Sequence, residues 1–179
     1  MPAFKLLRSE TVLEGRVFKI RHDVVRTPSG QEAGYDIVEH RGSVVMIPID
    51  EHGNLIFVRQ FRPATGIDLL ELPAGALGEN ETREQCAARE LREETGMAAG
   101  TLKKIGEFYL APGYSSEFMA AFVATELRPD PLTADADEFL QLETLALREA
   151  YRAAASGAIS DAKSLAALFL ARPLLLGSD

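Results

Sequence analysis

The sequence contains little cysteine and little positive charge. Cys86 is the only cysteine among 179 residues, which excludes an intrachain disulfide and a cysteine-based zinc site. The formal net charge is −8, which argues against a nucleic-acid backbone or an anionic membrane as the main partner, since both are bound through basic patches. A phosphate-bearing small ligand is compatible with this charge, because bound metal ions supply positive charge locally.

The sequence also lacks a long apolar segment. The N-terminal stretch MPAFKLLRSE has no apolar signal core, and the apolar run near the C-terminus is interrupted by Arg172 and Pro173. Hydrophobic residues make up 46% of the chain and charged residues 26%, as in ordinary globular proteins. We therefore expect a cytoplasmic protein with a well-buried core, in agreement with a single cysteine in a reducing compartment.

Hydrophobic periodicity predicts a strand-rich first part, one internal helix, further strands and two terminal helices. This order indicates an α+β fold with a mixed sheet and helices packed on it. The turn at 51–54 precedes what we interpret as a return strand. The predicted strands are 10–26 (a strand pair), 34–40, 43–50, 55–62, 69–75, 101–113, 117–127 and 139–145, and the predicted helices are 83–95, 147–157 and 161–175.

The internal helix has clear local signals at both ends. Thr82 and Gln85 match a capping box, and Gly96 stands where a helix ends in a left-handed residue. Ala87, Ala88 and Leu91 form its apolar stripe. These signals predict a helix of about three and a half turns.

Three carboxylates crowd one face of this helix. Glu90, Glu93 and Glu94 have the spacing i, i+3 and i+4, at which like charges repel by roughly 0.2–0.5 kcal/mol per pair. A hard divalent cation such as Mg²⁺ or Mn²⁺ prefers oxygen ligands and would relieve this repulsion. The alternative is a solvated acidic face with Arg89 and Arg92 as partners within the helix.

The segment GALGENETREQCAARELREETGM, residues 75–97, matches every fixed position of the Nudix box, so the chain resembles the Nudix hydrolases. The resemblance implies an α/β/α sandwich in which a loop–helix–loop binds divalent cations and a nucleoside diphosphate linked to another moiety is cleaved. On this chain it implies Glu90, Glu93 and Glu94 as catalytic residues and metal ligands, together with the carbonyl of Ala74.

The remaining box positions have a structural interpretation. Glu81 and Arg89 are expected to form a salt bridge that fixes the loop against the helix, while Gly75 and Gly96 bracket the motif. Many relatives carry a glutamate where this chain has Gly78. The number of bound metal ions is therefore left open.

The resemblance extends to the ADP-ribose pyrophosphatase branch through LIFVRQFRPATG, LLELPAG, APGYSSE and SGAISDAKSLAAL. It implies hydrolysis of ADP-ribose to AMP and ribose 5-phosphate. Three alternatives stay open: a pyrophosphatase for another nucleotide sugar such as GDP-mannose, a non-catalytic ADP-ribose sensor, and an acidic helix without metal dependence.

The candidate substrate-binding residues lie outside the box. Arg59 and Arg62 stand at the end of a strand, and the planar guanidinium of Arg62 is suited to grip a phosphate. An ordinary surface arginine is the alternative for each. By resemblance, Tyr35 and Asp36 contribute to the adenosine end of the pocket, where Asp36 would accept a hydrogen bond from the adenine amine.

Val17 and Phe18 are candidates to pack on the base, with a role in the core as the alternative. In the loop APGYSSE, Gly113 and two serines predict mobility, and loops of this kind often carry function. By resemblance, Glu117 at the end of this loop assists the attacking water. Whether Glu117 or a box glutamate is the general base stays open.

The resemblance also implies an organisation in two parts. Residues 1–42 would form N-terminal strands that pair across a homodimer, and residues 43–179 would form the Nudix domain.

Overall fold

A computed structural model describes residues 3–133 and 139–177 of the chain. The chain divides into two compact units, each with its own contacts. The first unit consists of Met1–Gly42 and Phe108–Phe118, and the second of Ser43–Glu107 and Met119–Asp179. The acidic stretch DADE at 135–138 lies outside the described residues.

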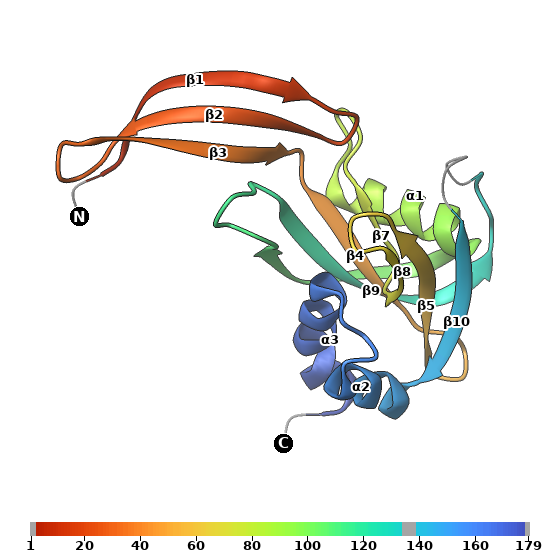
Figure 1. Cartoon of the computed structure of the whole chain (residues 1–179). Coiled ribbons are helices and arrows are strands. Elements are labelled where there is room, and N and C mark those ends of the chain that lie inside the picture. Colours follow the sequence, from red (N-terminus) through yellow and green to blue (C-terminus); the bar gives the residue numbers. More distant parts are fainter. Residues whose placement is uncertain (1–2, 134–138, 178–179) are drawn as a thin grey trace. The chain divides into compact units, whose positions relative to one another are not determined.

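The first unit is built on an antiparallel three-stranded sheet, whose strands run side by side in Figure 1. Its strands are β1 (Lys5–Glu14), β2 (Phe18–Arg26) and β3 (Glu32–His40). A tight turn joins β1 to β2, in which the Gly15 amide donates to the carbonyl of Phe18 at 2.9 Å. The predicted strand pair is confirmed, and β1 begins earlier than the alternation indicated.

The second unit contains two sheets. One has the order β7-β4-β9-β8, with β4 parallel to β9 and antiparallel to β7, so it is a mixed sheet as predicted. The other is antiparallel, with the order β10-β5-β6. The strands are β4 (Ser43–Pro48), β5 (Asn54–Arg62), β6 (Ile67–Glu71), β7 (Ala74–Ala76), β8 (Met97–Tyr109), β9 (Phe118–Pro129) and β10 (Leu140–Ala146).

Two details of the strand predictions are wrong. The chain turns at 51–54, but β5 does not return along β4: a single bridge between Ile49 and Leu55 joins them, and they belong to different sheets. The predicted strand 69–75 is two strands, β6 and β7, separated at Leu72 and Pro73. Proline cannot donate to a strand ladder, which explains the break.

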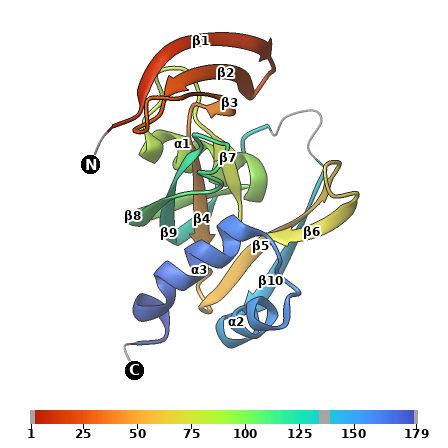
Figure 2. The same ribbon diagram turned by 60° about the vertical axis from the view of Figure 1, so that its left-hand side comes forward.

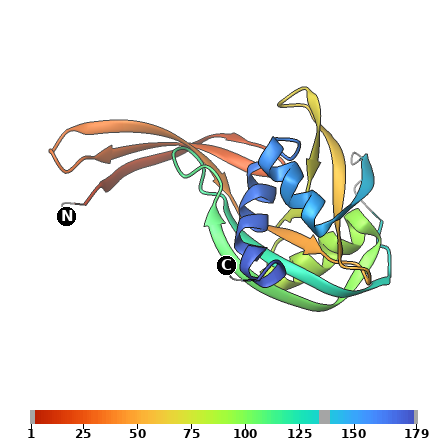
Figure 3. The same ribbon diagram turned by 90° about the horizontal axis from the view of Figure 1, so that it is seen from below.

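Three helices complete the second unit: α1 (Arg83–Thr95), α2 (Leu147–Ser156) and α3 (Ala162–Leu175). Helices α1 and α3 both contact β4 and cover its two faces (Figure 2). Helix α2 lies beside α3 (Figure 3), where the Tyr151 hydroxyl donates to the carbonyl of Leu168 at 2.8 Å. The predicted α/β/α layering is confirmed. Among the described residues, every helix is too short or too polar to pass through a lipid bilayer.

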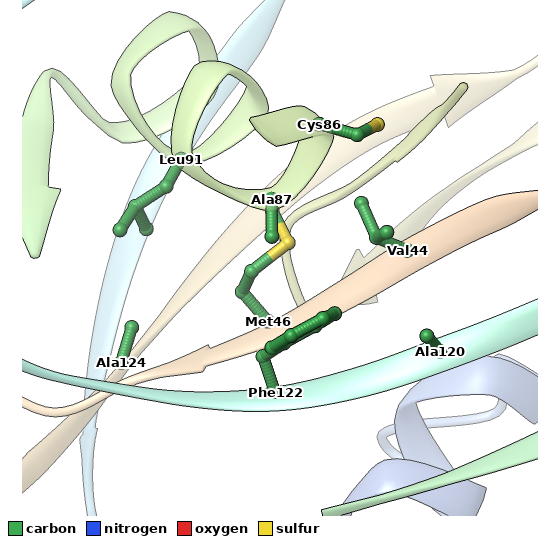
Figure 4. Close-up of a cluster of buried hydrophobic side chains, with 8 residues drawn as sticks. All are labelled: Val44, Met46, Cys86, Ala87, Leu91, Ala120, Phe122 and Ala124. Atoms are coloured by element: carbon green, nitrogen blue, oxygen red, sulfur yellow. The ribbon is translucent and has the colours of Figure 1, made fainter. Parts of the chain in front are cut away.

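The core beneath α1 explains how this helix is held. Ala87 and Leu91 point from α1 onto Met46 of β4 and Phe122 of β9, and all four are fully buried (Figure 4). Fully burying a Leu or Phe side chain contributes roughly 1.5–3 kcal/mol. The apolar stripe of α1 therefore anchors one side of the helix and fixes the direction of its glutamates.

Candidate active site

Both ends of α1 are capped by the residues that the sequence indicated. The Gln85 amide donates to Thr82 Oγ1 at 3.2 Å, and the Thr82 amide donates to Gln85 Oε1 at 2.9 Å. At the other end, Gly96 is left-handed with φ 72° and donates to the carbonyl of Arg92. Capping at both ends and core packing together define which side chains face the sheet.

Two of the three candidate ligand glutamates are buried. Glu90 and Glu94 are 8% and 9% exposed, one helical turn apart, next to the fully buried Leu91. Glu93 is more accessible, with 22% of its side chain exposed. Buried carboxylates are costly unless they are paired, hydrogen-bonded or bound to metal, so their partners decide what this face can do.

The segment 74–75 lies directly against these carboxylates. A Cβ atom at Gly75 would stand 1.9 Å from Glu90 Cδ, so Glu90 occupies the space that any side chain at position 75 would need. The Ala74 amide donates to Glu94 Oε2 at 3.1 Å. The glycine of the box thus provides room for one carboxylate, and its neighbour orients the other.

Arg89 is the hub of the remaining acidic contacts. Its Nε and Nη2 donate to the two carboxylate oxygens of Glu81, both at 2.8 Å. Its Nη1 donates to Glu90 Oε1 and Glu93 Oε2, both at 2.7 Å. The expected salt bridge between Glu81 and Arg89 is therefore present, and the same guanidinium also bridges two of the box glutamates.

Glu81 fixes the loop before the helix. It accepts from the Gly78 amide at 2.8 Å as well as from Arg89. The hydrogen bonds from Arg89 lower the pKa of Glu81 to about 2, against the opposing effect of its burial. The same contacts raise the pKa of Arg89. This ion pair stays charged at neutral pH and joins the loop to the helix.

The carboxylates have suitable chemistry for a hard divalent cation but are not preassembled. Within residues 3–133 and 139–177, no three His, Cys, Asp or Glu side chains are gathered as a metal site. Arg89 draws Glu90 and Glu93 to itself, while Glu94 lies on Ala74. The donors are oxygen atoms, which suits Mg²⁺ or Mn²⁺, and the space at Gly75 admits the Glu90 carboxylate. The residues therefore fit such an ion.

A second charged cluster lies where strands β5 and β6 meet helix α3. Glu71, with a side chain only 1% exposed, accepts two hydrogen bonds from Arg62, from Nε at 2.8 Å and from Nη2 at 2.7 Å. Lys163 Nζ donates to Glu71 Oε2 and also pairs with Asp161 Oδ2 at 3.0 Å. The buried Glu71 carboxylate thus holds Arg62 and also pairs with Lys163.

The charges of this cluster stabilise one another. Burial by itself would raise the pKa of Glu71, but Arg62 and Lys163 outweigh it and lower that pKa. The pKa of Arg62 is raised by its hydrogen bonds to Glu71 and by the charges of Asp161 and Glu94. Arg62 is therefore close enough to Glu94 to sense its charge. Glu71 and Lys163 were missed by sequence reasoning, although an acid in the apolar run LLELPAG was a usable signal.

Arg59 has a different setting from Arg62. Its Nε donates to Glu143 on the neighbouring strand β10, which raises its pKa. Residues three apart on a strand point to opposite faces, and Arg59 lines a cavity of about 210 Å³ with Phe61 and Phe139. The two arginines that the sequence grouped therefore lie in separate environments.

The other substrate-binding candidates belong to the first unit. Asp36 lies 2.7 Å from His22 Nδ1 and is well exposed, and Tyr35 is 44% exposed. Val17 and Phe18 line a cavity of about 260 Å³, whose rim carries charged side chains of both signs. A partly exposed apolar pair at a cavity is compatible with packing on a base, whereas a core role does not agree with exposures of 43% and 41%.

The loop before β9 is tied to strand β3 rather than free. The Val38 amide donates to the Tyr114 carbonyl at 2.8 Å, and the Ser116 amide donates to the Val38 carbonyl at 2.9 Å. Gly113 lies in open space, with no atom near its missing Cβ. Glu117, half-buried at the end of the loop, belongs to the first unit, and its role stays a prediction.

Comparisons with known proteins place this loop–helix arrangement in a family. The NUDIX domain model matches residues 39–168, and the chain belongs to this family. The chain is 34% identical to the ADP-ribose pyrophosphatase of Bacillus subtilis (strain 168), covering 92% of this chain and 90% of that protein.

Two further comparisons agree with this assignment. The chain is 41% identical over 126 residues to the ADP-ribose pyrophosphatase of Mycobacterium tuberculosis (strain ATCC 25618 / H37Rv), which is 70% of this chain and 61% of that protein. A crystal structure of an ADP compounds hydrolase superposes with a TM-score of 0.85 at 28% identity, covering 97% of this chain and 95% of the other. The recognition of a Nudix hydrolase from the box is confirmed.

Proposed function

We propose that this protein hydrolyses the pyrophosphate bond of a nucleoside diphosphate sugar, with ADP-ribose as the preferred substrate. The observation that carries the proposal is the pair of buried carboxylates, Glu90 and Glu94, held against Ala74 and Gly75. The similarity to two ADP-ribose pyrophosphatases favours ADP-ribose. The products would be AMP and ribose 5-phosphate.

Each box residue has a defined task in this proposal. A bound Mg²⁺ or Mn²⁺ ion supplies positive charge to the diphosphate and polarises water. Glu90, Glu93, Glu94 and the carbonyl of Ala74 would hold such ions. Arg89 would keep its bidentate pair with Glu81, so the loop would stay in place.

The hydrolysis itself needs a base and an anion-binding group. A water oxygen bonds to one phosphorus atom, the bridging P–O bond breaks, and the water proton passes to a carboxylate, either Glu117 or a box glutamate. Arg62 binds the diphosphate through its guanidinium. Arg59 contributes less, because it points to the opposite face of β5 from Arg62 and pairs there with Glu143. For the adenosine we propose residues of the first unit, Tyr35, Asp36, Val17 and Gly113.

A screen of nucleoside diphosphate sugars tests the proposal. A coupled phosphatase releases phosphate only from the monoester products, and Mg²⁺ and Mn²⁺ are compared. We expect ADP-ribose to be hydrolysed fastest and Glu94→Gln to lower kcat/KM by about 100-fold or more, equivalent to about 2.7 kcal/mol in the barrier. Glu84→Gln, an exposed glutamate on the same helix, is the matched control and should retain the rate.

The same screen decides between the alternatives. Faster hydrolysis of GDP-mannose, to GMP and mannose 1-phosphate, would change the substrate assignment. ADP-ribose binding without hydrolysis would favour a sensor. A rate that is unchanged in Glu94→Gln would remove the metal-ligand assignment.

We further propose a cytoplasmic homodimer in which residues 1–42 pair between subunits. All residues of β1 are exposed within one chain, among them Leu6 and Val12 at 55% and 56%. Exposed apolar side chains at this density favour an interface. The single cysteine favours a reducing compartment, and the charge of −8 disfavours nucleic acid or membrane as partner.

A further inference from the structure

We propose that Lys163 is a positioning residue that acts through Glu71 to hold the guanidinium of Arg62 in place for the substrate's diphosphate. The proposal rests on the proposed function and extends it to the C-terminal helix. Lys163 is 8% exposed and lies in the first turn of α3, and Glu71 ends strand β6. These two residues are separated by 92 positions in the sequence.

A burial argument favours a role beyond stability. Desolvating a carboxylate and an ammonium group costs several kcal/mol per ion, and well-packed apolar residues of similar size are often as stabilising. Glu71 and Lys163 are nevertheless both buried, at 1% and 8% exposure. Because the net contribution of such a buried pair to stability is small, a role in positioning a neighbouring side chain explains it better.

The geometry of Arg62 shows what is held. Glu71 takes up one edge of the guanidinium, through Nε and Nη2. Within the described residues, Nη1 makes no hydrogen bond, and 39% of the Arg62 side chain is exposed. The second edge, formed by Nη1 and Nη2, is therefore available for two parallel hydrogen bonds to phosphate oxygens.

Lys163 controls the carboxylate that orients this arginine. It contacts Glu71 Oε2, the oxygen that also accepts from Arg62 Nη2. Without the ammonium group, the two negative charges of Glu71 and Asp161 would face only the positive charge of Arg62. The excess negative charge would disfavour an anionic substrate, and the Glu71 carboxylate would lose one of its partners. Lys163 thus affects both the position of Arg62 and the local charge.

The backbone connects this cluster to the box glutamates. The Leu72 amide donates to Ser164 Oγ at 2.7 Å, and Ser164 is held by the N-cap Asp161 of α3. Two residues further along, the Ala74 amide contacts Glu94. The same short segment, 71–74, therefore joins the start of α3 to the carboxylates of α1.

The test compares steady-state kinetics with ADP-ribose in Lys163→Met, Lys163→Gln and the matched control Lys104→Met. Lys104 is a half-exposed lysine paired with Glu107. We expect KM to rise about tenfold or more in Lys163→Met, with kcat within about threefold, because ground-state and transition-state binding are lost together. Lys163→Gln keeps a donor for Glu71 and should show a smaller rise, and Lys104→Met should leave KM unchanged.

A double-mutant cycle shows whether Lys163 acts through Arg62. If it does, adding Lys163→Met to Arg62→Met should raise KM by no more than about twofold, because coupled residues are not additive. Additive effects, an unchanged KM in the single variants or a fall in kcat alone would overturn the proposal. If Lys163→Met shows no thermal unfolding transition and is therefore not folded, the KM and kcat of Lys163→Gln are judged by the same criteria. A wild type that hydrolyses no nucleotide sugar would refute the proposed function instead.

Discussion

The two charged clusters of the second unit are built on opposite principles. Around α1, one guanidinium, Arg89, pairs with three carboxylates, Glu81, Glu90 and Glu93, and a fourth, Glu94, accepts a hydrogen bond from the Ala74 amide. At the start of α3, Arg62 and Lys163 face two carboxylates, Glu71 and Asp161.

The difference between the two clusters indicates what each is for. The carboxylates around α1 carry more negative charge than the single guanidinium of Arg89 offsets, and a bound cation would offset the rest, so the α1 cluster is suited to bind metal. The α3 cluster is balanced by its own residues and needs no ion. It is therefore suited to hold a side chain in one position.

Among the variants that compare the two clusters, the largest expected effect comes from filling the space that the Glu90 carboxylate occupies. In Gly75→Ala the new Cβ would displace the Glu90 carboxylate, the end of a flexible side chain. A misplacement of about 1 Å in an active site can cost about 100-fold, so we expect a loss of this size in kcat/KM with the fold retained. Steady-state kinetics measures kcat/KM, and thermal unfolding shows whether the fold is retained.

The matched control is Gly78→Ala in the same loop. Its Cβ would lie 3.1 Å from Glu81 Oε2, a contact that a small shift can relieve. This variant should keep kcat/KM within about threefold, since less than 1 kcal/mol of transition-state binding is at stake. Equal losses of kcat/KM in Gly75→Ala and Gly78→Ala would mean that any change in the loop lowers the rate, and that the position of the Glu90 carboxylate is not the cause.

An intermediate effect is expected for the scaffold pair of the α1 cluster. Glu81→Gln should lower the free energy of unfolding by about 2 kcal/mol, the scale of hydrogen bonds to charged groups. Because the pKa of Glu81 is lowered from 4.5 to about 2 in the folded protein, its contribution is full above about pH 4.5 and is lost as the pH falls toward 2.

Urea unfolding of wild type and Glu81→Gln between pH 3 and 7 measures this linkage. The difference between the two proteins should be constant near neutral pH and shrink at the acidic end. A difference independent of pH would contradict the role of the ionised carboxylate.

The smallest effect is expected for Arg59. Glu143 holds its guanidinium, 36% of the side chain is exposed, and exposed ion pairs contribute about 0–1 kcal/mol. Arg59→Met should therefore change KM for ADP-ribose by less than about threefold, well below the effect of Arg62→Met. A larger effect for Arg59 would reverse the ranking of the two arginines.

Local signals in the sequence were sufficient for the α1 motif. The capping box of Thr82 and Gln85 and the left-handed Gly96 act within a few residues, so the helix was predicted with its bounds. The pairing of strands was less accessible, because β4 finds its partners in β9 and β7 rather than in the next strand. The Lys163–Glu71 contact was missed for the same reason, since it joins residues 92 apart.

The candidate site was only partly accessible from the sequence. The spacing of Glu90 and Glu94 was enough to place them on one face, because helical periodicity is local. The sequence could not show that Arg89 bridges Glu90 and Glu93, or that Gly75 makes room for a carboxylate. Both depend on how the loop folds back on α1.

Binding of Mn²⁺, followed by electron paramagnetic resonance in the presence of ADP-ribose, tests most directly whether the acidic face of α1 exists to bind cations. The wild type should take up at least one ion per chain, and the double variant Glu90→Gln/Glu94→Gln should lose this binding while remaining folded. Equal uptake by both proteins would contradict the account.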